Sequence, residues 1–331
     1  MSTLSIPSTA KTLLYDVATQ KVQLVQHPTP TVTVDSTEHL IRAHAAALCA
    51  GELSWLSNFP SGNPDKEPVP AYDVAGTVII SPLGSPFKPG DAVYTRTNYF
   101  RTGCAREYAI VLTEELGRVP GHLTWEEAAS VPLSAMTAWQ ALFVQSGIGE
   151  LHDKSWQGKR VLVTAASGAV GNWIVQLATL AGAEVIATCG PKNVDFVKNL
   201  GAKVVLNYRD IGIKEWFQSD SVRQVDVVID CVGNTPLEES WYAVKSGGIF
   251  MSIVQPPNQK RPSDVDIPDV RNFFFIMQPD GRQMSYISQL LEEGKVHPVV
   301  DSVWTLEEHE DAFERLNSGH ARGKVVFKIA D

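Results

Sequence analysis

The chain has 331 residues, more than a single hydrophobic core usually organises, which predicts about two domains. Its 28 basic and 37 acidic residues give a net charge of −9, and no Lys/Arg run interrupts this balance, so a nucleic-acid partner is not expected. Hydrophobic residues make up 44% of the chain and charged residues 20%, as in folded globular proteins and unlike disordered or fibrous ones.

The cellular location can be predicted from the apolar runs, the N-terminal residues and the spacing of the cysteines. No apolar run reaches the ~18–20 residues of a membrane span, so no membrane partner is expected. The opening MSTLSIPSTAK has neither the basic nor the apolar region of a secretory signal. Cys49, Cys104, Cys189 and Cys231 lie far apart, as free thiols in a reducing compartment do. We therefore expect a cytoplasmic protein.

The first third of the chain is predicted to be rich in short strands. Between residue 12 and about 125, apolar stretches alternate with Pro and Gly turns, a pattern typical of a β-barrel or sandwich. The expected strands are LLYD (13–16), QKVQLVQH (20–27), HLIRAHAAAL (39–48), DVAGTVIIS (73–81), DAVYTR (91–96) and AREYAIV (105–111).

A regular alternation of strands and helices follows. TWEEAASVPLSAMTAWQALF (124–143) predicts one helix, with Thr124 as N-cap and Glu127 completing a capping box. Apolar runs separated by helical stretches then predict a parallel sheet covered on both faces. Its strands are expected at 161–165, 184–188, 204–208, 225–232, 248–254 and 272–277, and its helices at 169–182, 192–200, 212–219, 236–245 and 281–293.

The C-terminal segment again shows the strand-rich pattern of the first third of the chain. It reads as a strand, VVDSVW (299–304), an acidic helix (305–319) and a final strand, KVVFKIA (324–330). The sequence thus predicts a β-rich domain that is interrupted by an α/β domain and closed by the C-terminus.

The strongest motif is a glycine-rich turn between a strand and an amphipathic helix. The turn covers Ser167, Gly168, Ala169, Val170 and Gly171, and the next strand follows at the spacing of a βαβ unit. Gly168 would let the backbone approach a pyrophosphate, Gly171 would let the helix pack on the sheet, and the helix N-terminus would attract the phosphates. Ala165 and Ser167 stand where the fingerprint usually begins with glycine, so a tight turn without a ligand is the alternative.

The end of the following strand favours NADPH over NADH. An NAD site carries an acid about 20 residues past the glycines, whereas Thr188–Asn193 contains none. Lys192 and the amides of that turn would accept a 2′-phosphate, and Tyr208 would lie near the adenosine. The alternatives are that Lys192 is a solvated charge and Tyr208 an aromatic at the sheet edge.

Several collinear segments carry a resemblance to a known family. They are VPAYDVAGTVI (69–79), KPGDAVY (88–94), AREYAIV (105–111), EEAASVPLSAMTAWQAL (126–142), AASGAVG (165–171), DVVIDCVG (226–233), KSGGIFMSI (245–253) and GHARGKVVFKI (319–329). The chain resembles the medium-chain dehydrogenase/reductase superfamily, specifically its zinc-free quinone oxidoreductase and enoyl reductase branch. The resemblance implies an α/β fold, with a GroES-like barrel (1–126 and 296–331) interrupted by a Rossmann domain (127–295).

The resemblance also implies a set of cofactor-binding residues. Beyond the glycine turn, Lys192 and Tyr208, these are Cys231, Val232, Gly233, Ile253, Val254, Phe274, Phe275, Gly323 and Lys324. Relatives commonly form homodimers, here expected through NFFFIM (272–277). The stretch 255–269 is expected to be either an ordered excursion or a lid.

The zinc ligands of metal-dependent relatives are not expected here. Cys49 falls at the first catalytic ligand position, but Tyr72 stands at the histidine position, and the third position, within Pro132–Ser134, lacks a cysteine. The region 90–110 holds only Cys104 where a structural site needs four cysteines. One thiolate does not make a zinc site, so we expect no metal.

Without a metal to polarise an alcohol, hydride transfer to a small, apolar, electron-poor substrate remains feasible. We expect a reductase of enones, enals, enoyl groups or quinones, with the hydroxyls of Tyr72 and Thr137 as candidate catalytic donors. The expected substrate pocket includes Cys49, Trp55, Phe59 and Phe100. Two alternatives stay open: a zinc-type alcohol dehydrogenase, and a noncatalytic NADPH-binding sensor or accessory protein.

Overall fold

The computed structural model describes residues 6–58 and 66–330 and divides the chain into two compact units. The first unit comprises residues up to Met136 together with Gln278 onwards, and the second comprises Thr137–Met277. Among the described residues, no helix has the length and apolarity to cross a bilayer.

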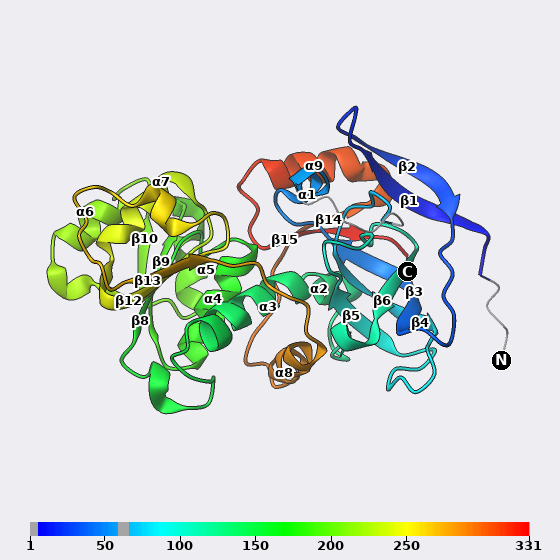
Figure 1. The fold of residues 1–331 in the computed structure, drawn as a ribbon, viewed down its shortest axis with the longest axis horizontal. Coiled ribbons are helices and arrows are strands. Elements are labelled where there is room, and N and C mark those ends of the chain that lie inside the picture. The colour runs from blue at the N-terminus through cyan, green and yellow to red at the C-terminus, as the bar shows by residue number, and fades with distance from the viewer. Residues whose placement is uncertain (1–5, 59–65, 331) are drawn as a thin grey trace. The chain divides into compact units, whose positions relative to one another are not determined.

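The first unit is built on a mixed seven-stranded sheet in the order β14-β15-β3-β4-β5-β7, with β6 also paired to β3 (Figure 1). Its strands are β1 (Thr9–Asp16), β2 (Lys21–Pro28), β3 (Glu38–Ala47), β4 (Asp73–Ile80), β5 (Ala92–Arg96), β6 (Tyr108–Leu112), β7 (Gly117–Arg118), β14 (Val300–Thr305) and β15 (Lys324–Lys328). Strands β1 and β2 form a separate antiparallel pair. Its helices are α1 (Glu52–Asn58), α2 (Trp125–Ala129), α8 (Gly281–Glu292), α9 (His309–Asn317) and the beginning of α3 (Pro132–Trp139).

The second unit contains a six-stranded sheet in the order β10-β9-β8-β11-β12-β13, in which every neighbouring pair is parallel. Its strands are β8 (Arg160–Val163), β9 (Glu184–Cys189), β10 (Val204–Asn207), β11 (Val225–Asp230), β12 (Val244–Ser252) and β13 (Arg271–Phe274). Its helices are α4 (Ala169–Leu180), α5 (Val194–Asn199), α6 (Ile213–Gln218) and α7 (Asn234–Glu239). The strand order places β8 and β11 at the centre, where the chain reverses its direction of travel across the sheet.

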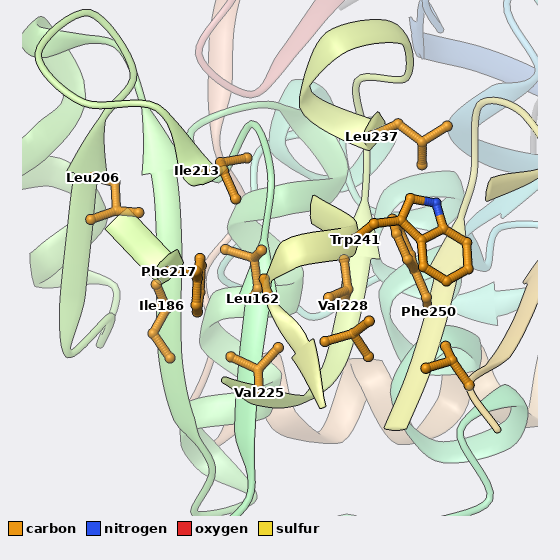
Figure 2. Close-up of a cluster of buried hydrophobic side chains, with 13 residues drawn as sticks. Leu162, Ile186, Leu206, Ile213, Phe217, Val225, Val228, Leu237, Trp241 and Phe250 are labelled. Carbon is orange, nitrogen blue, oxygen red and sulfur yellow. The ribbon is translucent and has the colours of Figure 1, made fainter. Parts of the chain in front are cut away.

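Burial of apolar side chains holds the second unit together. One cluster joins strand residues with the helices that cover them, and Figure 2 shows Leu162, Phe217 and Trp241 among its members. Strands that are apolar on both faces need helices on both sides, which explains the apolar stretches 161–163 of β8 and 227–229 of β11.

The predicted helix over 124–143 is divided in the structure. Thr124 caps α2, and the capping box with Glu127 is confirmed. A new helix, α3, starts at Pro132, because proline cannot donate the backbone hydrogen bond that a continuous helix would need there. A π-helical segment covers Gln140–Gln145.

The division between the units differs from the predicted boundaries at 126/127 and 295/296. Leu133 N donates to Asp73 Oδ1 at 2.8 Å, which ties the start of α3 to the first unit. Helix α8 also belongs there, since Tyr94 Oη and Ser288 Oγ are 2.7 Å apart. A Cβ placed on Gly281 would lie 2.8 Å from backbone oxygens of residues 114 and 116, so α8 packs directly on the sheet region.

Candidate active site

In the second unit, the glycine turn joins β8 to α4 in the way the sequence predicts. Gly168 occupies the N-cap position of α4, and no side chain caps the amides of the first helical turn. A Cβ on Gly171 would lie 2.3 Å from the carbonyl oxygen of Ala165, so only glycine allows this approach of helix to turn. Ala165 itself has φ of 50°, a left-handed conformation that costs free energy for an alanine. A diphosphate fits this cradle, because the amides at the helix start have no side-chain acceptor.

The ends of three central strands are fixed by one buried carboxylate. Asp230, at the end of β11, is completely buried and accepts hydrogen bonds from Thr164 Oγ1 and Ser252 Oγ, both at 2.8 Å. It also accepts from the amide of Gly233 at 2.9 Å. Thr164 and Ser252 lie at the carboxyl ends of β8 and β12, so Asp230 holds three strand ends in register. This network was not predicted from the sequence, although Thr164, Asp230 and Ser252 each stand at the end of an apolar strand.

The predicted lining of the cofactor cleft follows directly from these strand ends. Cys231 donates its amide to Thr164 Oγ1 at 2.8 Å, and Val232 is 39% exposed. Ile253 and the half-exposed Val254 follow β12. The last two predicted residues lie on the neighbouring strand and just beyond it: Phe274 ends β13, and the amide of Phe275 donates to Ser252 O.

The turn after β9 and Tyr208, both predicted at the adenosine end, lie together. A Cβ on Gly190 would lie 3.2 Å from Tyr208 Oη, so the phenol lies over this turn. Asn193 Nδ2 donates to Ser167 Oγ at 3.1 Å and links the turn to the glycine motif. Lys192 is exposed, and we find no ion pair to it within residues 6–58 and 66–330.

In the first unit, the structure brings Cys49, Trp55 and Tyr72 together. The ring centroids of Trp55 and Tyr72 are 5.6 Å apart. Tyr72 is 1% exposed, and its hydroxyl has no hydrogen-bond partner among the described residues. Burial, the charge of Glu52 and the neighbouring thiol of Cys104 raise the pKa of Tyr72, against the opposing effect of Arg96. Burial likewise raises the pKa of the Cys49 thiol to about 11.

The other predicted residues are more scattered. Thr137 is buried on α3 and is the first residue of the second unit. Phe100 is 44% exposed, and its ring centroid lies 4.3 Å from that of Tyr99, which in turn contacts Trp55. Phe59 lies outside the described residues.

Lys324, for which the resemblance implies a cofactor-binding role, is buried within the first unit. It starts β15 in the first unit, is 3% exposed, and its Nζ lies 2.8 Å from Asp73 Oδ2. Burial alone would lower the pKa of Lys324, but the charge of the nearby Asp73 carboxylate has the larger opposite effect, so the pKa is raised overall. Gly323 precedes it with φ of 88°, and a Cβ there would lie 2.2 Å from Val299 O. Gly323 and Lys324 thus place a buried cation beside Cys49, with which Lys324 also interacts electrostatically.

Two further charged residues of this cluster were not predicted. Arg96 ends β5, opposite Asp73 in the strand register, and is 1% exposed. Glu52 starts α1, is 2% exposed, and accepts hydrogen bonds from the amides of Cys49 at 3.1 Å and Ala71 at 3.0 Å. Ala71 has φ of 59°, so Glu52 stabilises a strained backbone just before Tyr72. An arginine in the otherwise uncharged strand AVYTR was the one available signal.

The carboxyl of Glu52 is expected to make folding stability depend on pH. Burial raises the pKa of Glu52 from its ordinary 4.5 to about 7, although the Ala71 amide opposes the rise. The folded protein therefore holds this proton more tightly than the unfolded chain, and its stability falls as the pH rises from about 4.5 to 7. The Glu52→Gln variant lacks this dependence. The difference in unfolding free energy between the two proteins should change by about 3 kcal/mol between pH 4 and 8.

Urea unfolding of both proteins at several pH values measures this difference, because the other titrating groups contribute equally to both. Parallel stability curves would show that Glu52 is ionised at the same pH in the folded and unfolded states.

No group of three or more His, Cys, Asp or Glu side chains within the described part of the chain is arranged to hold a metal ion. The residues around Cys49 do not fit zinc. The cations Lys324 and Arg96 interact electrostatically with the Cys49 sulfur and lie close enough to oppose a divalent ion there.

Comparisons with known proteins agree with this fold and site. A family model described as a zinc-binding dehydrogenase matches residues 200–327. The chain is 48% identical over 330 residues to the probable zinc-binding oxidoreductase, mitochondrial, of Arthroderma benhamiae, covering 99% of each. It is 31% identical to the NAD(P)H oxidoreductase RTN4IP1, mitochondrial, of Homo sapiens, covering 88% of this chain and 82% of that one. The quinone oxidoreductase from Coxiella burnetii superposes with a TM-score of 0.79 at 27% identity, covering 97% of this chain and 99% of that one.

The two units and these similarities define an oxidoreductase that uses a nicotinamide cofactor. The chain belongs to the medium-chain dehydrogenase/reductase superfamily, in its quinone oxidoreductase branch, and the predicted GroES-like and Rossmann domains are confirmed as its fold. The cytoplasmic location predicted from the sequence is wrong: the relatives from A. benhamiae and H. sapiens are both named mitochondrial. The features behind that prediction, the residues MSTLSIPSTAK and the spacing of the four cysteines, do not separate these two compartments.

Proposed function

We propose that this protein is an NADPH-dependent reductase that transfers hydride to an activated double bond or a quinone without a metal. The observation that carries the proposal is the side-chain set around Cys49. There, a buried tyrosine hydroxyl and two buried cations, Lys324 and Arg96, occupy the neighbourhood in which a zinc enzyme needs thiolate and imidazole ligands.

Such a set of groups suits an acceptor that is already electron-poor. A bound reduced nicotinamide supplies the hydride. Addition at the β-carbon of an enone moves negative charge onto the carbonyl oxygen, where hydrogen-bond donors and positive charge stabilise it. The Tyr72 hydroxyl, buried and without a partner in the described chain, is a suitable donor. A proton from solvent then completes the saturated product at the α-carbon.

We assign binding of the acceptor and binding of the cofactor to different units. The first unit binds the acceptor in surroundings that exclude water, and the second binds the cofactor through the glycine turn and the strand ends that Asp230 fixes. In this proposal Thr137, at the start of the second unit, contacts the nicotinamide ribose or ring.

The preference for NADPH rests on the turn after β9. No carboxylate lies between Thr188 and Asn193, and the exposed Lys192 is available for a 2′-phosphate beside the phenol of Tyr208. The Lys192→Ala variant should therefore raise the KM for NADPH about 10- to 100-fold and leave the KM for NADH nearly unchanged. Lys198→Ala, which removes an exposed lysine from the end of α5, is the matched control. An equal effect of Lys192→Ala on both cofactors would contradict this role.

The proposed location is the mitochondrion, as in the names of the relatives from A. benhamiae and H. sapiens. Fractionation of cells that express the full-length protein, with markers for the matrix and the cytosol, tests it.

The function is tested by mixing the purified protein with NADPH and a panel of enones, enals and quinones while following the nicotinamide absorbance. We expect NADPH oxidation with at least one acceptor class, and the same rate after treatment with a chelator. Stoichiometric zinc together with oxidation of simple alcohols by NADP⁺ would instead identify a zinc alcohol dehydrogenase. Cofactor binding without any turnover would identify a noncatalytic NADPH-binding protein.

A further inference from the structure

Arg96 is a buried cation with hydrogen-bond donors that lack an acceptor in the described part of the chain. It is 1% exposed, and neither its Nε nor its Nη1 has an acceptor among the described residues. Arginine cannot lose its proton inside a protein, so these donors remain charged. Leaving a buried, charged donor without an acceptor costs free energy, and such groups are rare in folded proteins unless they serve a function such as ligand binding or catalysis.

The neighbouring acids do not supply the missing acceptors. Asp73, across the strand pair, accepts from the Leu133 amide through Oδ1 and faces Lys324 through Oδ2. Glu115, which also interacts electrostatically with Arg96, pairs with Arg101 at 3.3 Å. The carboxylates near Arg96 are therefore engaged elsewhere.

Three aromatic rings lie near the guanidinium, and none of them supplies an acceptor for Nε or Nη1. Its Cζ lies 5.9 Å from the ring centroid of Trp55, 5.8 Å from that of Tyr72 and 5.7 Å from that of Tyr99. Contacts of this kind stabilise the positive charge and exclude water, which strengthens any hydrogen bond that a ligand makes there. The hydroxyl of Tyr72, which also lacks a partner in the described chain, adds a second free donor to the cluster.

We propose that Arg96 binds the carbonyl oxygen of the acceptor and stabilises the negative charge that develops on it during hydride transfer. This inference rests on the proposed function and narrows it to conjugated carbonyl compounds, including quinones, in which an oxygen becomes an enolate or phenolate oxygen. The hydride adds to the β-carbon, the C=C electron pair forms the new double bond of the enolate, the C=O electron pair moves to oxygen, and a solvent proton then gives the neutral product. Trp55, partly exposed on α1, is the ring that we expect to move when the acceptor enters.

The test compares Arg96→Met and Arg96→Lys with the wild type, using one enone and NADPH. Losing one charged donor to the oxyanion should lower kcat about 100- to 1000-fold in Arg96→Met, and Arg96→Lys should recover part of this loss. The Kd for NADPH, measured by fluorescence, should stay within about twofold of the wild type.

Arg106→Met is the matched control for removing a buried arginine. Arg106 is 4% exposed, but its guanidinium donates to Glu67 Oε2 and Pro28 O within the same unit. This variant should lower the melting temperature and leave the kcat of the folded protein unchanged. A purely structural Arg96 would behave in the same way, and that result would overturn the proposal.

A binding measurement separates this inference from the proposed function. The probe is 4-nitrophenol, which should bind the wild type in its ionised, yellow form and bind Arg96→Lys and Arg96→Met at least tenfold more weakly. If the wild type reduces no acceptor but binds the phenolate through Arg96, the proposed function fails and the anion site stands. If enones are reduced with unchanged kcat by the folded variants, or if only the KM for carboxylate-bearing acceptors changes, the assignment of Arg96 is wrong.

Discussion

The Gly171→Ala variant is expected to lose nicotinamide binding almost completely. Its new Cβ would lie 2.3 Å from Ala165 O, 2.8 Å from Ala166 Cα and 2.9 Å from Ala165 C, all backbone atoms of the turn that we propose binds phosphate. Neither partner can move without separating α4 from β8. We expect the Kd for NADPH to rise at least 100-fold and the unfolding free energy to fall by about 1–3 kcal/mol.

Titration calorimetry with NADPH and thermal unfolding measure the two effects. The control is Gly121→Ala, because a Cβ there meets no atom within 4 Å and its backbone angle suits any residue. Wild-type affinity in Gly171→Ala would show that the turn takes no part in cofactor binding.

Removing either member of the Asp73–Lys324 pair is expected to destabilise the first unit by about 3–5 kcal/mol. The two side chains are 1% and 3% exposed, so each single substitution leaves an uncompensated buried charge. Lys324→Met keeps the aliphatic part of the chain, and Asp73→Asn keeps the shape of the carboxyl. The double variant removes both charges and should be less destabilised than the sum of the single variants by roughly 2 kcal/mol or more.

Urea unfolding of the four proteins, followed by a probe in the first unit, measures this coupling. Additive effects, or single variants that each cost less than about 1 kcal/mol, would mean that the pair is not an ionic contact in the folded protein.

The parts of the fold that could be predicted from the sequence are those with a local signal. Thr124 and Glu127 carry a capping box within four residues, and the glycine turn has its strand and helix on either side. The helix predicted across Pro132 was too long, because the apolar pattern continues through the break and masks it. The predicted strands 204–208 and 272–277 extend beyond the C-terminal ends of β10 and β13, the two edge strands of the sheet. Apolar residues continue there after the hydrogen-bonded strand has ended.

The charged cluster of the first unit could not be predicted, because strand pairing rather than spacing assembles it. Asp73 and Arg96 face each other across β4 and β5, and Lys324 arrives from the other end of the chain on β15. No periodicity connects residues so far apart in sequence. The resemblance implies a cofactor-binding role for Gly323 and Lys324 but does not indicate that Asp73 would pair with the lysine.

The transfer of hydride to carbon is tested most directly with NADPH deuterated at the transferable position. An enone reduced by the wild-type protein in ordinary water should carry one deuterium at the β-carbon and a proton from solvent at the α-carbon, with the same yield after metal chelation. A product without deuterium, or no consumption of the cofactor with any conjugated carbonyl compound, would contradict the account.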